Sequence, residues 1–434
     1  MDVCIDSMIR FHGEPDQQMI DDLTLNHPAC ESAKKMNLYY AGDKFIKFYE
    51  YDDGIFSIPR GYLNMPGATN KTIFPLADGL PFSGTLREEQ ENSFLAMLEN
   101  KQGIVNAPCG SGKTVIACKF ISDIKTNCLV IVHTQALLEQ WKERIKQFTG
   151  YDAGVIQGAK AECSRVTVAM MQTIIKRLEC LDFFGAVIFD ECHHVACTSL
   201  QTVCNHSKAE YRIGLTATPG RTDSLKKAVF WLVGNIIYTI NPKDIEQQRI
   251  KPCVWTVTVN ECNSVTMAKD FNKLYKAVTE SMPRNESIIK YLKLAVKAEW
   301  KILAIGKRID HLKYLSENID NTAYISGTTK KADREDLLTK LETGKLSVLF
   351  ATEKLAAEGL DRPAIDCLAI IAPIAHEPTI TQAVGRIQRK IEGKKRAIVL
   401  DFVDSNGIGA GVAAKRKGIY RKMGLDVEVY KDQT

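Results

Sequence analysis

Short strand-like runs alternate with amphipathic segments along most of this sequence. Residues 104–106, 128–132 and 186–189 are runs of strand length, and segments with helical periodicity follow the first two. Continuous apolar runs are typical of strands buried on both faces. Strands that alternate with helices predict a parallel sheet with helical crossovers, so this part of the chain is expected to be an α/β lobe.

A second series of such runs lies nearer the C-terminus. It comprises residues 302–305, 323–325, 348–350, 367–371 and 397–400. We therefore expect two tandem α/β lobes, each built on a parallel sheet. The expected boundaries are 83–240 for the first lobe, 241–283 for a linker and 284–434 for the second lobe.

The first 82 residues show a different pattern, rich in aromatic side chains around an Asp53-Gly54 pair. These side chains are Tyr39, Tyr40, Phe45, Phe48, Tyr49, Tyr51 and Phe56. An Asp-Gly pair between short alternating runs is a strong signal for a β-hairpin. Residues 1–82 are therefore expected to form a small β-rich accessory domain. A helix should follow it, with Thr85 and Glu88 as its capping box.

Two basic segments each allow two interpretations. In residues 43–51, lysines interleave with aromatic residues, which could stack on unpaired bases or pack in the core of the small domain. Packing in the core is the favoured interpretation. Residues 415–417 and 421–422 could contact phosphates, but a solvated helix face is favoured there.

Composition limits the class of protein. The chain has 434 residues, of which 45% are hydrophobic and 25% charged, as in folded globular proteins with two or three domains. Its net charge of +5 is too small to identify a phosphate-bearing partner. The N-terminus lacks a signal-peptide pattern, and the apolar run 368–372 stops at Pro373. We expect neither secretion nor a membrane segment, and a cytoplasmic or nucleic-acid-associated location.

The cysteines predict reduced thiols. There are 13 of them, an odd number without regular spacing, as expected for a cytosol-like compartment. The densest group of possible metal ligands is Cys192, His193, His194, Cys197, Cys204 and His206. Its spacing matches no standard zinc pattern. Cys192 and His193 belong to a segment discussed below, and the others, including Cys197 and Cys204, are interpreted as small apolar core residues.

A glycine-rich segment lies between the first strand and the next helix of the first lobe. Residues 107–114 read Ala-Pro-Cys-Gly-Ser-Gly-Lys-Thr, which predicts a loop whose backbone N–H groups surround phosphates. The loop residues expected at the phosphates are Gly110, Ser111 and Gly112. Lys113 would reach the β- and γ-phosphates, and Thr114 would bind Mg²⁺. Ala107 replaces the first glycine of the general pattern.

Two carboxylates follow the buried run 186–189. Adjacent acidic residues are usually solvated, but Asp190 and Glu191 come at the carboxyl end of a strand, where ligands bind in open α/β sheets. Asp190 is therefore expected to hold Mg²⁺. Glu191 is expected to orient or deprotonate the water that attacks the γ-phosphate.

Together these residues resemble superfamily 2 helicases of the DExH kind, whose signature box matches residues 190–193. The resemblance spans about residues 85–404 and implies two RecA-like lobes that use ATP and Mg²⁺. Arg87 and Gln90 are similar to the adenine-reading segment of the family. Residues 215–219 are similar to the segment that couples hydrolysis to nucleic-acid binding, which implies that role for Thr216, Ala217 and Thr218.

The resemblance also implies contacts to nucleic acid. Arg221 and Asp223 extend the coupling segment and point to excision-repair and phage branch-migration helicases. The first contact segment of the family is matched by Thr134, Leu137, Gln140 and Trp141. Gln172 matches another contact, although Met170 stands where the family often has a phosphate-binding threonine.

In the second lobe, the resemblance continues through two segments. Thr352 is implied to touch the strand backbone, and Gly359 and Asp361 to face the nucleotide. Arg386 and Arg389 match the family's arginine motif, in which Arg389 would be the finger and Arg386 a nucleotide sensor. A guanidinium can donate two hydrogen bonds to γ-phosphate oxygens and stabilise the transition state.

The expected function is ATP-dependent unwinding or remodelling of branched or duplex DNA by a monomer, with replication, repair or transcription proteins as possible partners. Two alternatives stay open. The chain could be a nucleic-acid-stimulated ATPase that displaces a bound protein such as a stalled polymerase, or it could act on RNA.

Overall fold

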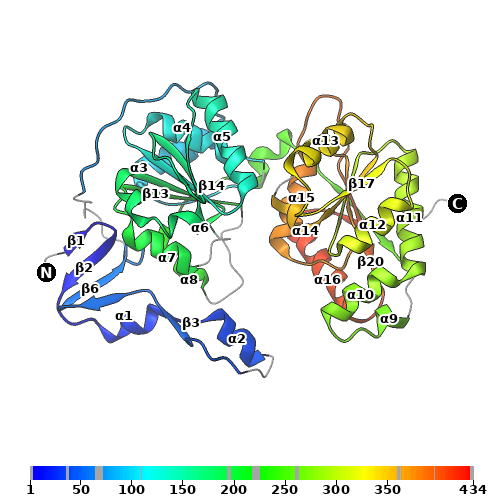
Figure 1. The fold of residues 1–434 in the computed structure, drawn as a ribbon, viewed down its shortest axis with the longest axis horizontal. Helices are drawn as coiled ribbons and strands as arrows, with labels where there is room; N and C mark the ends of the chain where they lie inside the picture. The colour runs from blue at the N-terminus through cyan, green and yellow to red at the C-terminus, as the bar shows by residue number, and fades with distance from the viewer. Residues whose placement is uncertain are drawn as a thin grey trace. The chain divides into compact units, whose positions relative to one another are not determined.

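The apolar runs of the two predicted lobes become strands of two separate sheets in the computed structural model (Figure 1). Contacts divide the chain into two units, Met1–Asp244 and Ile245–Thr434. The structure describes residues 3–35, 39–63, 72–108, 110–192, 197–217, 225–259, 263–358, 362, 364–394 and 396–430.

The first unit contains an eight-stranded sheet in the order β10-β9-β11-β8-β12-β13-β7-β14. Its strands are β7 (Gln102–Asn106), β8 (Cys128–Val132), β9 (Gly154–Gln157), β10 (Lys160–Ala161), β11 (Val166–Met170), β12 (Ala186–Asp190), β13 (Tyr211–Thr216) and β14 (Ile236–Thr239). Every neighbouring pair is parallel except β9 and β10. The predicted parallel α/β lobe is confirmed.

Helices pack on this sheet in two groups. They are α3 (Glu88–Asn100), α4 (Lys113–Asp123), α5 (Gln135–Thr149), α6 (Met171–Ile174), α7 (Cys197–His206) and α8 (Lys226–Val233), with the 3₁₀ helix η1 (Leu178–Phe183). Neighbours α3, α4 and α5 pack side by side, as do α6, α7 and α8. Helix α3 begins after Arg87, whose N–H donates to the Gln90 side chain at 3.0 Å. The expected capping box of Thr85 and Glu88 is therefore wrong, because the helix begins later.

The N-terminal residues form a small β-rich structure. One sheet has the order β1-β2-β6-β5, and β3 pairs with β4. The elements are β1 (Val3–Ile5), β2 (Met8–His12), α1 (Gln17–Asp22), β3 (Thr24–Asn26), α2 (Pro28–Lys35), β4 (Phe45–Lys47), β5 (Glu50–Asp52) and β6 (Ile55–Pro59). Asp53 and Gly54 both have positive φ, 46° and 73°, and connect β5 to β6 as the predicted hairpin turn.

The aromatic residues of this N-terminal structure divide between core and surface. Phe48 and Phe56 are buried, as the favoured interpretation expected. Phe45 and Tyr51 are 55% and 48% exposed. The alternation of side chains along β4 explains the division, because Ile46 faces inward between exposed neighbours.

The N-terminal structure shares its core with the first lobe. Phe48 and Ile58 belong to the same apolar cluster as Val187 and Phe189 of the large sheet. The buried Arg212 guanidinium donates to the carbonyl oxygens of Ser7 in the N-terminal part and of Cys204, Ser207 and Leu232 in the lobe, at 2.9–3.1 Å. The described residues between 3 and 63 are therefore packed on the lobe as one body with it.

The second unit contains a seven-stranded parallel sheet in the order β17-β18-β16-β19-β20-β15-β21. Its strands are β15 (Cys253–Thr258), β16 (Ile302–Gly306), β17 (Thr322–Ile325), β18 (Val348–Thr352), β19 (Cys367–Ile370), β20 (Ile398–Val403) and β21 (Val427–Val429). Alternate residues belong to different core clusters, with Ile302 and Ala304 in one and Leu303 and Ile305 in the other. Both faces of the sheet are buried, which explains the continuous apolar runs.

The helices of the second unit are α9 (Asn263–Thr266), α10 (Phe271–Glu280), α11 (Met282–Lys297), α12 (Ile309–Glu317), α13 (Lys331–Glu342), α14 (Glu353–Glu358), α15 (Glu377–Ile387) and α16 (Gly407–Lys422). The 3₁₀ helix η3 (Pro242–Gln248) spans the boundary between the units. Residues 241–283 were expected to be a linker, but β15 pairs with β20 along six residues. Strand β15 is therefore part of the second sheet, and the helices α9 and α10 of the expected linker also belong to the second unit.

The basic stretch near the C-terminus also differs from the expectation. Arg416 is 1% exposed and forms an ion pair with Asp401 at 2.7 Å, and its guanidinium also donates to the Phe402 carbonyl oxygen at 3.0 Å. Lys415 and Lys417 are exposed, as a solvated helix face predicts. Helical periodicity explains the difference, because Arg416 lies on the face of α16 that packs on the sheet.

Candidate nucleotide and nucleic-acid site

The loop predicted to bind phosphates lies between β7 and the N-terminus of α4. Gly110 and Gly112 have φ angles of 80° and 87°, which residues with a Cβ rarely adopt. Gly112 is the N-cap of α4, so the first N–H groups of that helix have no acceptor within the helix and point toward the loop. The Ser111 hydroxyl is buried and has no hydrogen-bond partner among the described residues. The loop therefore fits an anion that accepts from backbone N–H groups and this hydroxyl.

Arg87 and Gln90 stabilise this loop through hydrogen bonds to its backbone. The Arg87 guanidinium and the Gln90 amide each donate to the Ser111 carbonyl oxygen at 2.8 Å. A Cβ on Gly112 would lie 2.3 Å from the Gln90 amide nitrogen. These contacts fix the loop, and the adenine-reading role of both residues stays a prediction.

Charged groups gather beside the loop. The Lys113 ammonium lies 3.0 Å from a Glu191 carboxylate oxygen, and both side chains are mostly buried. Asp190 ends β12 next to them and is 7% exposed. Glu191 has a φ of 46°, an uncommon left-handed conformation that turns the chain directly after the strand. The structure thus brings together three of the predicted site residues.

Trp141 has a different place from the one expected. It was predicted to lie in a nucleic-acid contact segment, but it is 1% exposed and its indole N–H donates to Asp190 at 2.7 Å. The amphipathic pattern of α5 puts Trp141 on the buried face with Leu138 and Ile145. A buried indole N–H needs a hydrogen-bond acceptor. The amphipathic pattern that buries Trp141 was therefore the one signal in the sequence that its N–H bonds to a polar group such as Asp190.

Burial determines the electrostatics of the acidic pair. Burial, and secondly the neighbouring Glu191, raise the pKa of Asp190 to about 6. The Trp141 N–H and the Lys113 ammonium act in the opposite direction. A bound cation would offset the burial that disfavours the Asp190 carboxylate, so the oxygen ligands of Asp190 and of Thr114, the second residue of α4, fit Mg²⁺.

The predicted coupling segment begins next to the phosphate loop. Thr216 ends β13, pairs with Asn106 of β7, and accepts a hydrogen bond from the Ala107 N–H at 2.8 Å. Thr216 is thus hydrogen-bonded to the first residue of the loop, and the coupling role of Thr216 and Ala217 stays a prediction. Several predicted residues lie outside the described part of the chain: Cys109, His193, His194, Thr218, Pro219, Arg221, Asp223, Gly359 and Asp361.

Thr134 and Gln172 follow two neighbouring strands, β8 and β11. Val132 pairs with Met170, so the two residues meet at one edge of the sheet. The Gln172 amide donates to the His133 carbonyl oxygen at 3.4 Å, and Thr134 caps α5 by accepting from the Leu137 N–H at 3.3 Å. The structure places both residues together, and their contact with nucleic acid stays a prediction.

In the second unit, the predicted residues lie in three elements. Thr352 ends β18 and pairs with Gly306 of β16. Arg386 lies in α15, and Arg389 follows it in a backbone bridge with Arg249. This bridge fixes the arginine motif to the chain segment that enters the second unit.

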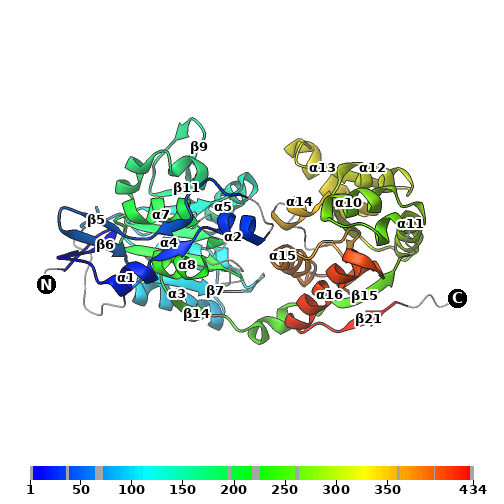
Figure 2. The ribbon, with the colours of Figure 1, turned by 90° about the horizontal axis from the view of Figure 1, so that it is seen from below.

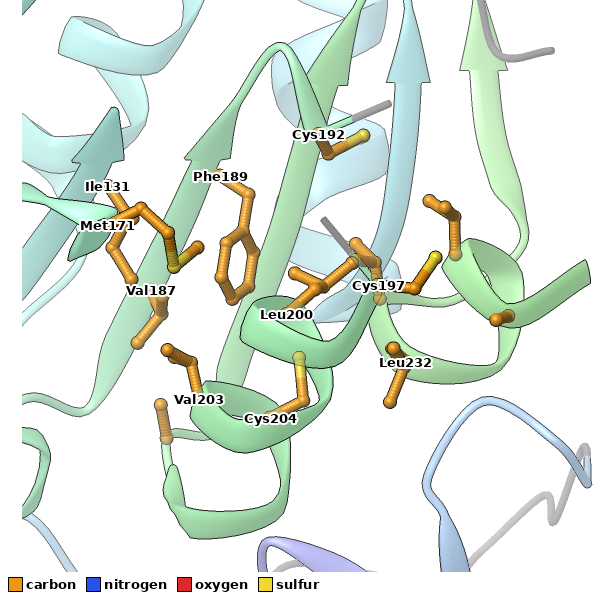
Figure 3. Packing of buried hydrophobic residues seen from close by; sticks show 14 of the residues in the cluster. Ile131, Met171, Val187, Phe189, Cys192, Cys197, Leu200, Val203, Cys204 and Leu232 are labelled. Atoms are coloured by element: carbon orange, nitrogen blue, oxygen red, sulfur yellow. The ribbon is translucent and has the colours of Figure 1, made fainter. Parts of the chain in front are cut away.

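The cysteines near the acidic pair pack in the apolar core. Cys192, Cys197 and Cys204 belong to one cluster with Leu200 and Leu232, as Figure 3 shows. Burial raises the pKa of the Cys204 thiol, which disfavours the thiolate that metals bind. The interpretation of Cys197 and Cys204 as core residues is confirmed. In the part of the chain that the structure describes, no cluster of potential metal ligands is found.

Two family patterns match this chain. The type III restriction enzyme res subunit family matches residues 83–221, and the helicase conserved C-terminal domain matches residues 283–390. A solved structure of an HsdR subunit of a type I restriction enzyme from Vibrio vulnificus shares the fold, with a TM-score of 0.58, 20% identity and coverage of 74% of this chain and 65% of that chain.

Among the described residues, none of the helices has the length and apolar character needed to cross a membrane.

Three relatives have similar sequences. A DNA 3'-5' translocase of Sulfurisphaera tokodaii is 28% identical over 78% of this chain and 87% of its own length. A protein named as a helicase in Escherichia phage T5 is 28% identical, covering 74% of this chain and 72% of the relative. One named as an ATP-dependent RNA helicase in Acanthamoeba polyphaga mimivirus is 25% identical, covering 97% of this chain and 86% of the relative.

Proposed function

Since this chain belongs to the superfamily 2 helicases, we propose that it is an ATP-driven motor that remodels branched DNA such as forks and four-way junctions. The enzyme is an ATP-dependent helicase, because both helicase domains are present in order. The relative named as a DNA translocase supports DNA as the substrate. The preference for branched DNA is the finer part of this proposal.

In this proposal, ATP is bound by the loop between β7 and α4. Thr114 and Asp190 would hold Mg²⁺, which neutralises phosphate charge when bound. Lys113 contributes a second positive charge, and its 3.0 Å ion pair with Glu191 gives way to a contact with phosphate. Glu191 then orients the attacking water and accepts its proton.

We also propose that Arg386 and Arg389 of the second unit act on the same phosphates. Each guanidinium can donate two hydrogen bonds to phosphate oxygens and stabilise charge in the transition state. The backbone of residues 388–389 is held by residues 249–250, and the Ile250 N–H donates to the Gln388 carbonyl oxygen at 2.8 Å. This support favours a defined position for the arginine motif.

The observation that carries the branched-DNA proposal is the rigid attachment of the N-terminal structure to the first lobe. Arg212 and Arg60 tie the two parts through backbone carbonyl groups. The β3–β4 ribbon presents Phe45 and Lys47 to solvent. A rigid ribbon that moves with the motor could hold one arm of a junction while the lobes move along another.

The experiment measures ATP hydrolysis and strand displacement with single-stranded, duplex, forked and four-way DNA and with RNA. A variant carrying Phe45→Ala and Lys47→Ala should lose the preference for forks and junctions but keep its response to single strands. Leu95→Ala is the control, because Leu95 is 50% exposed on α3 of the same unit.

Three outcomes would contradict the proposal. Equal activity of the Phe45→Ala/Lys47→Ala variant and the Leu95→Ala control on forks would show that the ribbon does not contribute to the preference for branched DNA. Stimulation by RNA alone would favour the RNA alternative. Stimulation of ATP hydrolysis by DNA without any strand displacement would favour the protein-displacing ATPase.

A further inference from the structure

Helices α9 and α10 form an insertion between β15 and α11 of the second unit (Figure 1). They have a small apolar core of their own, made by Val265, Leu274, Ala277 and Val278. Phe271, at the start of α10, is outside this core and is 48% exposed.

Phe271 pairs with a second aromatic residue one helical turn later. The ring centroids of Phe271 and Tyr275 are 6.1 Å apart, and the rings are tilted by 33°. The Tyr275 hydroxyl donates to the Pro373 carbonyl oxygen at 3.3 Å, and the Lys307 ammonium lies 5.6 Å from the Tyr275 ring centroid. Tyr275 is thus fixed in place, while Phe271 remains open to solvent.

These contacts locate the aromatic pair at the carboxyl edge of the second sheet. Lys307 follows β16, and Pro373 follows β19, which pairs with β16. Lys307 also forms an ion pair with Glu353, which directly follows Thr352 at the end of β18. In open α/β sheets, ligands bind at this edge. Tyr275 therefore lies at the same edge of the second sheet as Thr352, the residue predicted to touch the nucleic-acid backbone, and Phe271 packs on Tyr275 one helical turn away.

The charges around the pair are compatible with phosphate. Lys307 and Arg308 are both exposed and are paired with Glu353 and Asp310. The Arg308–Asp310 pair is exposed on both sides, and Lys307 is exposed although Glu353 is mostly buried. Ion pairs open to solvent contribute little free energy, so a phosphate group can compete for these cations. An exposed aromatic face with cations next to it is the arrangement by which proteins bind unpaired nucleotides, because every base has a face that can stack.

We propose that Phe271 and Tyr275 form a stacking platform for an unpaired base of a single nucleic-acid strand, whose flanking phosphates contact Lys307 and Arg308. This inference rests on the proposed function and adds a binding site on the second unit. The platform selects single strands over duplex, because the faces of paired bases are covered by their neighbours in the stack.

The test measures binding of the full-length protein to fluorescent single-stranded DNA, to the same sequence as RNA and to duplex. Phe271→Ala should weaken binding to single-stranded DNA about tenfold, as expected for the loss of one stacked base, and leave duplex binding unchanged. Phe271→Trp should retain tight binding. Met267→Ala is the matched control, because Met267 is an apolar residue of the same insertion and is 74% exposed.

Two results would overturn this inference. One is equal affinity of Phe271→Ala and Met267→Ala for single strands, and the other is equal weakening of duplex and single-strand binding. If Phe271→Ala weakens the binding of RNA but not of single-stranded DNA, the inference is overturned for DNA and the platform binds RNA. If the unmodified protein shows no stimulation of ATP hydrolysis by any nucleic acid, the proposed function fails instead, so the two failures are distinguishable.

Discussion

Lys113 is the residue whose role can be tested most directly. Its side chain is 12% exposed and lies beside Glu191, and in the proposed mechanism its charge binds phosphate. We predict that Lys113→Ala lowers the rate of ATP hydrolysis more than tenfold while the protein stays folded, since a lost charge contact in the transition state costs at least that much. Phosphate release measures the rate, and Lys125→Ala, an exposed lysine after the same helix, should have no effect.

Glu191 should separate ATP binding from hydrolysis. Glu191→Gln keeps the size of the side chain but removes the group that accepts a proton. We predict that this variant binds ATP with near-normal affinity and hydrolyses it at least a hundredfold more slowly. Equilibrium binding of a fluorescent ATP analogue and single-turnover hydrolysis measure the two steps. A variant that cannot bind ATP would show that the carboxylate supports the fold of the loop.

Trp141 should act through Asp190. Trp141→Phe keeps most of the buried apolar surface but removes the N–H that donates to Asp190 at 2.7 Å. We predict that half-maximal ATP hydrolysis then requires several-fold more Mg²⁺, because the carboxylate is less well oriented. A magnesium titration of the hydrolysis rate provides the measurement. An unchanged midpoint together with a lower melting temperature would assign Trp141 to packing alone.

At the level of single elements, the sequence predicted the features that depend on neighbouring residues. It missed those that depend on residues distant in the sequence. The strands β8 and β12 are continuous apolar runs, and the phosphate loop lies within eight consecutive residues, so both were visible in the sequence. β15 was taken for a linker, because polar and apolar residues are mixed in Cys253–Thr258 and the strand is only partly buried. The contact from Trp141 to Asp190 joins residues 49 positions apart and depends on how α5 packs.

Arg212 connects four elements and should contribute strongly to stability. Its guanidinium is buried among the carbonyl groups of Ser7, Cys204, Ser207 and Leu232. Removing it leaves these acceptors unsatisfied, so we predict that Arg212→Ala lowers the free energy of unfolding of the first unit by about 3 kcal/mol or more. Urea unfolding provides the measurement, with Arg144→Ala as the control, since the Arg144 guanidinium donates to the exposed Gln147 side chain.

At the scale of the whole molecule, the chain consists of two units in which the N-terminal structure belongs to the first. Sequence composition suggested an accessory domain, because its aromatic residues set it apart from the lobes. The shared core was not predictable, since it depends on side chains of α7 and α8 that are distant in the sequence. Figure 2 shows the N-terminal strands beside α7 and α8, and the Gly61 N–H donates to the Trp231 carbonyl oxygen at 2.9 Å.

This shared core leads to a prediction about deletion. Phe48 and Tyr62 pack edge-on against Trp231, and Phe48 is fully buried. Each large apolar side chain removed from such a core costs about 1.5–3 kcal/mol, so losing several is comparable with the whole stability of a domain. We therefore predict that a fragment of residues 83–434 lacks a cooperative unfolding transition for its first lobe. The fragments 1–244 and 245–434 should each unfold cooperatively.

Differential scanning calorimetry of the full chain and the three fragments tests this prediction. If residues 83–434 keep the first-lobe transition at the temperature of the full chain, the N-terminal structure is an independent domain and the shared core contributes little. If the transition is lost, a deletion cannot measure the role of the N-terminal structure in DNA remodelling, because the motor itself is damaged. Point variants of exposed residues such as Phe45 then provide the valid test, since they change the surface and leave the core intact.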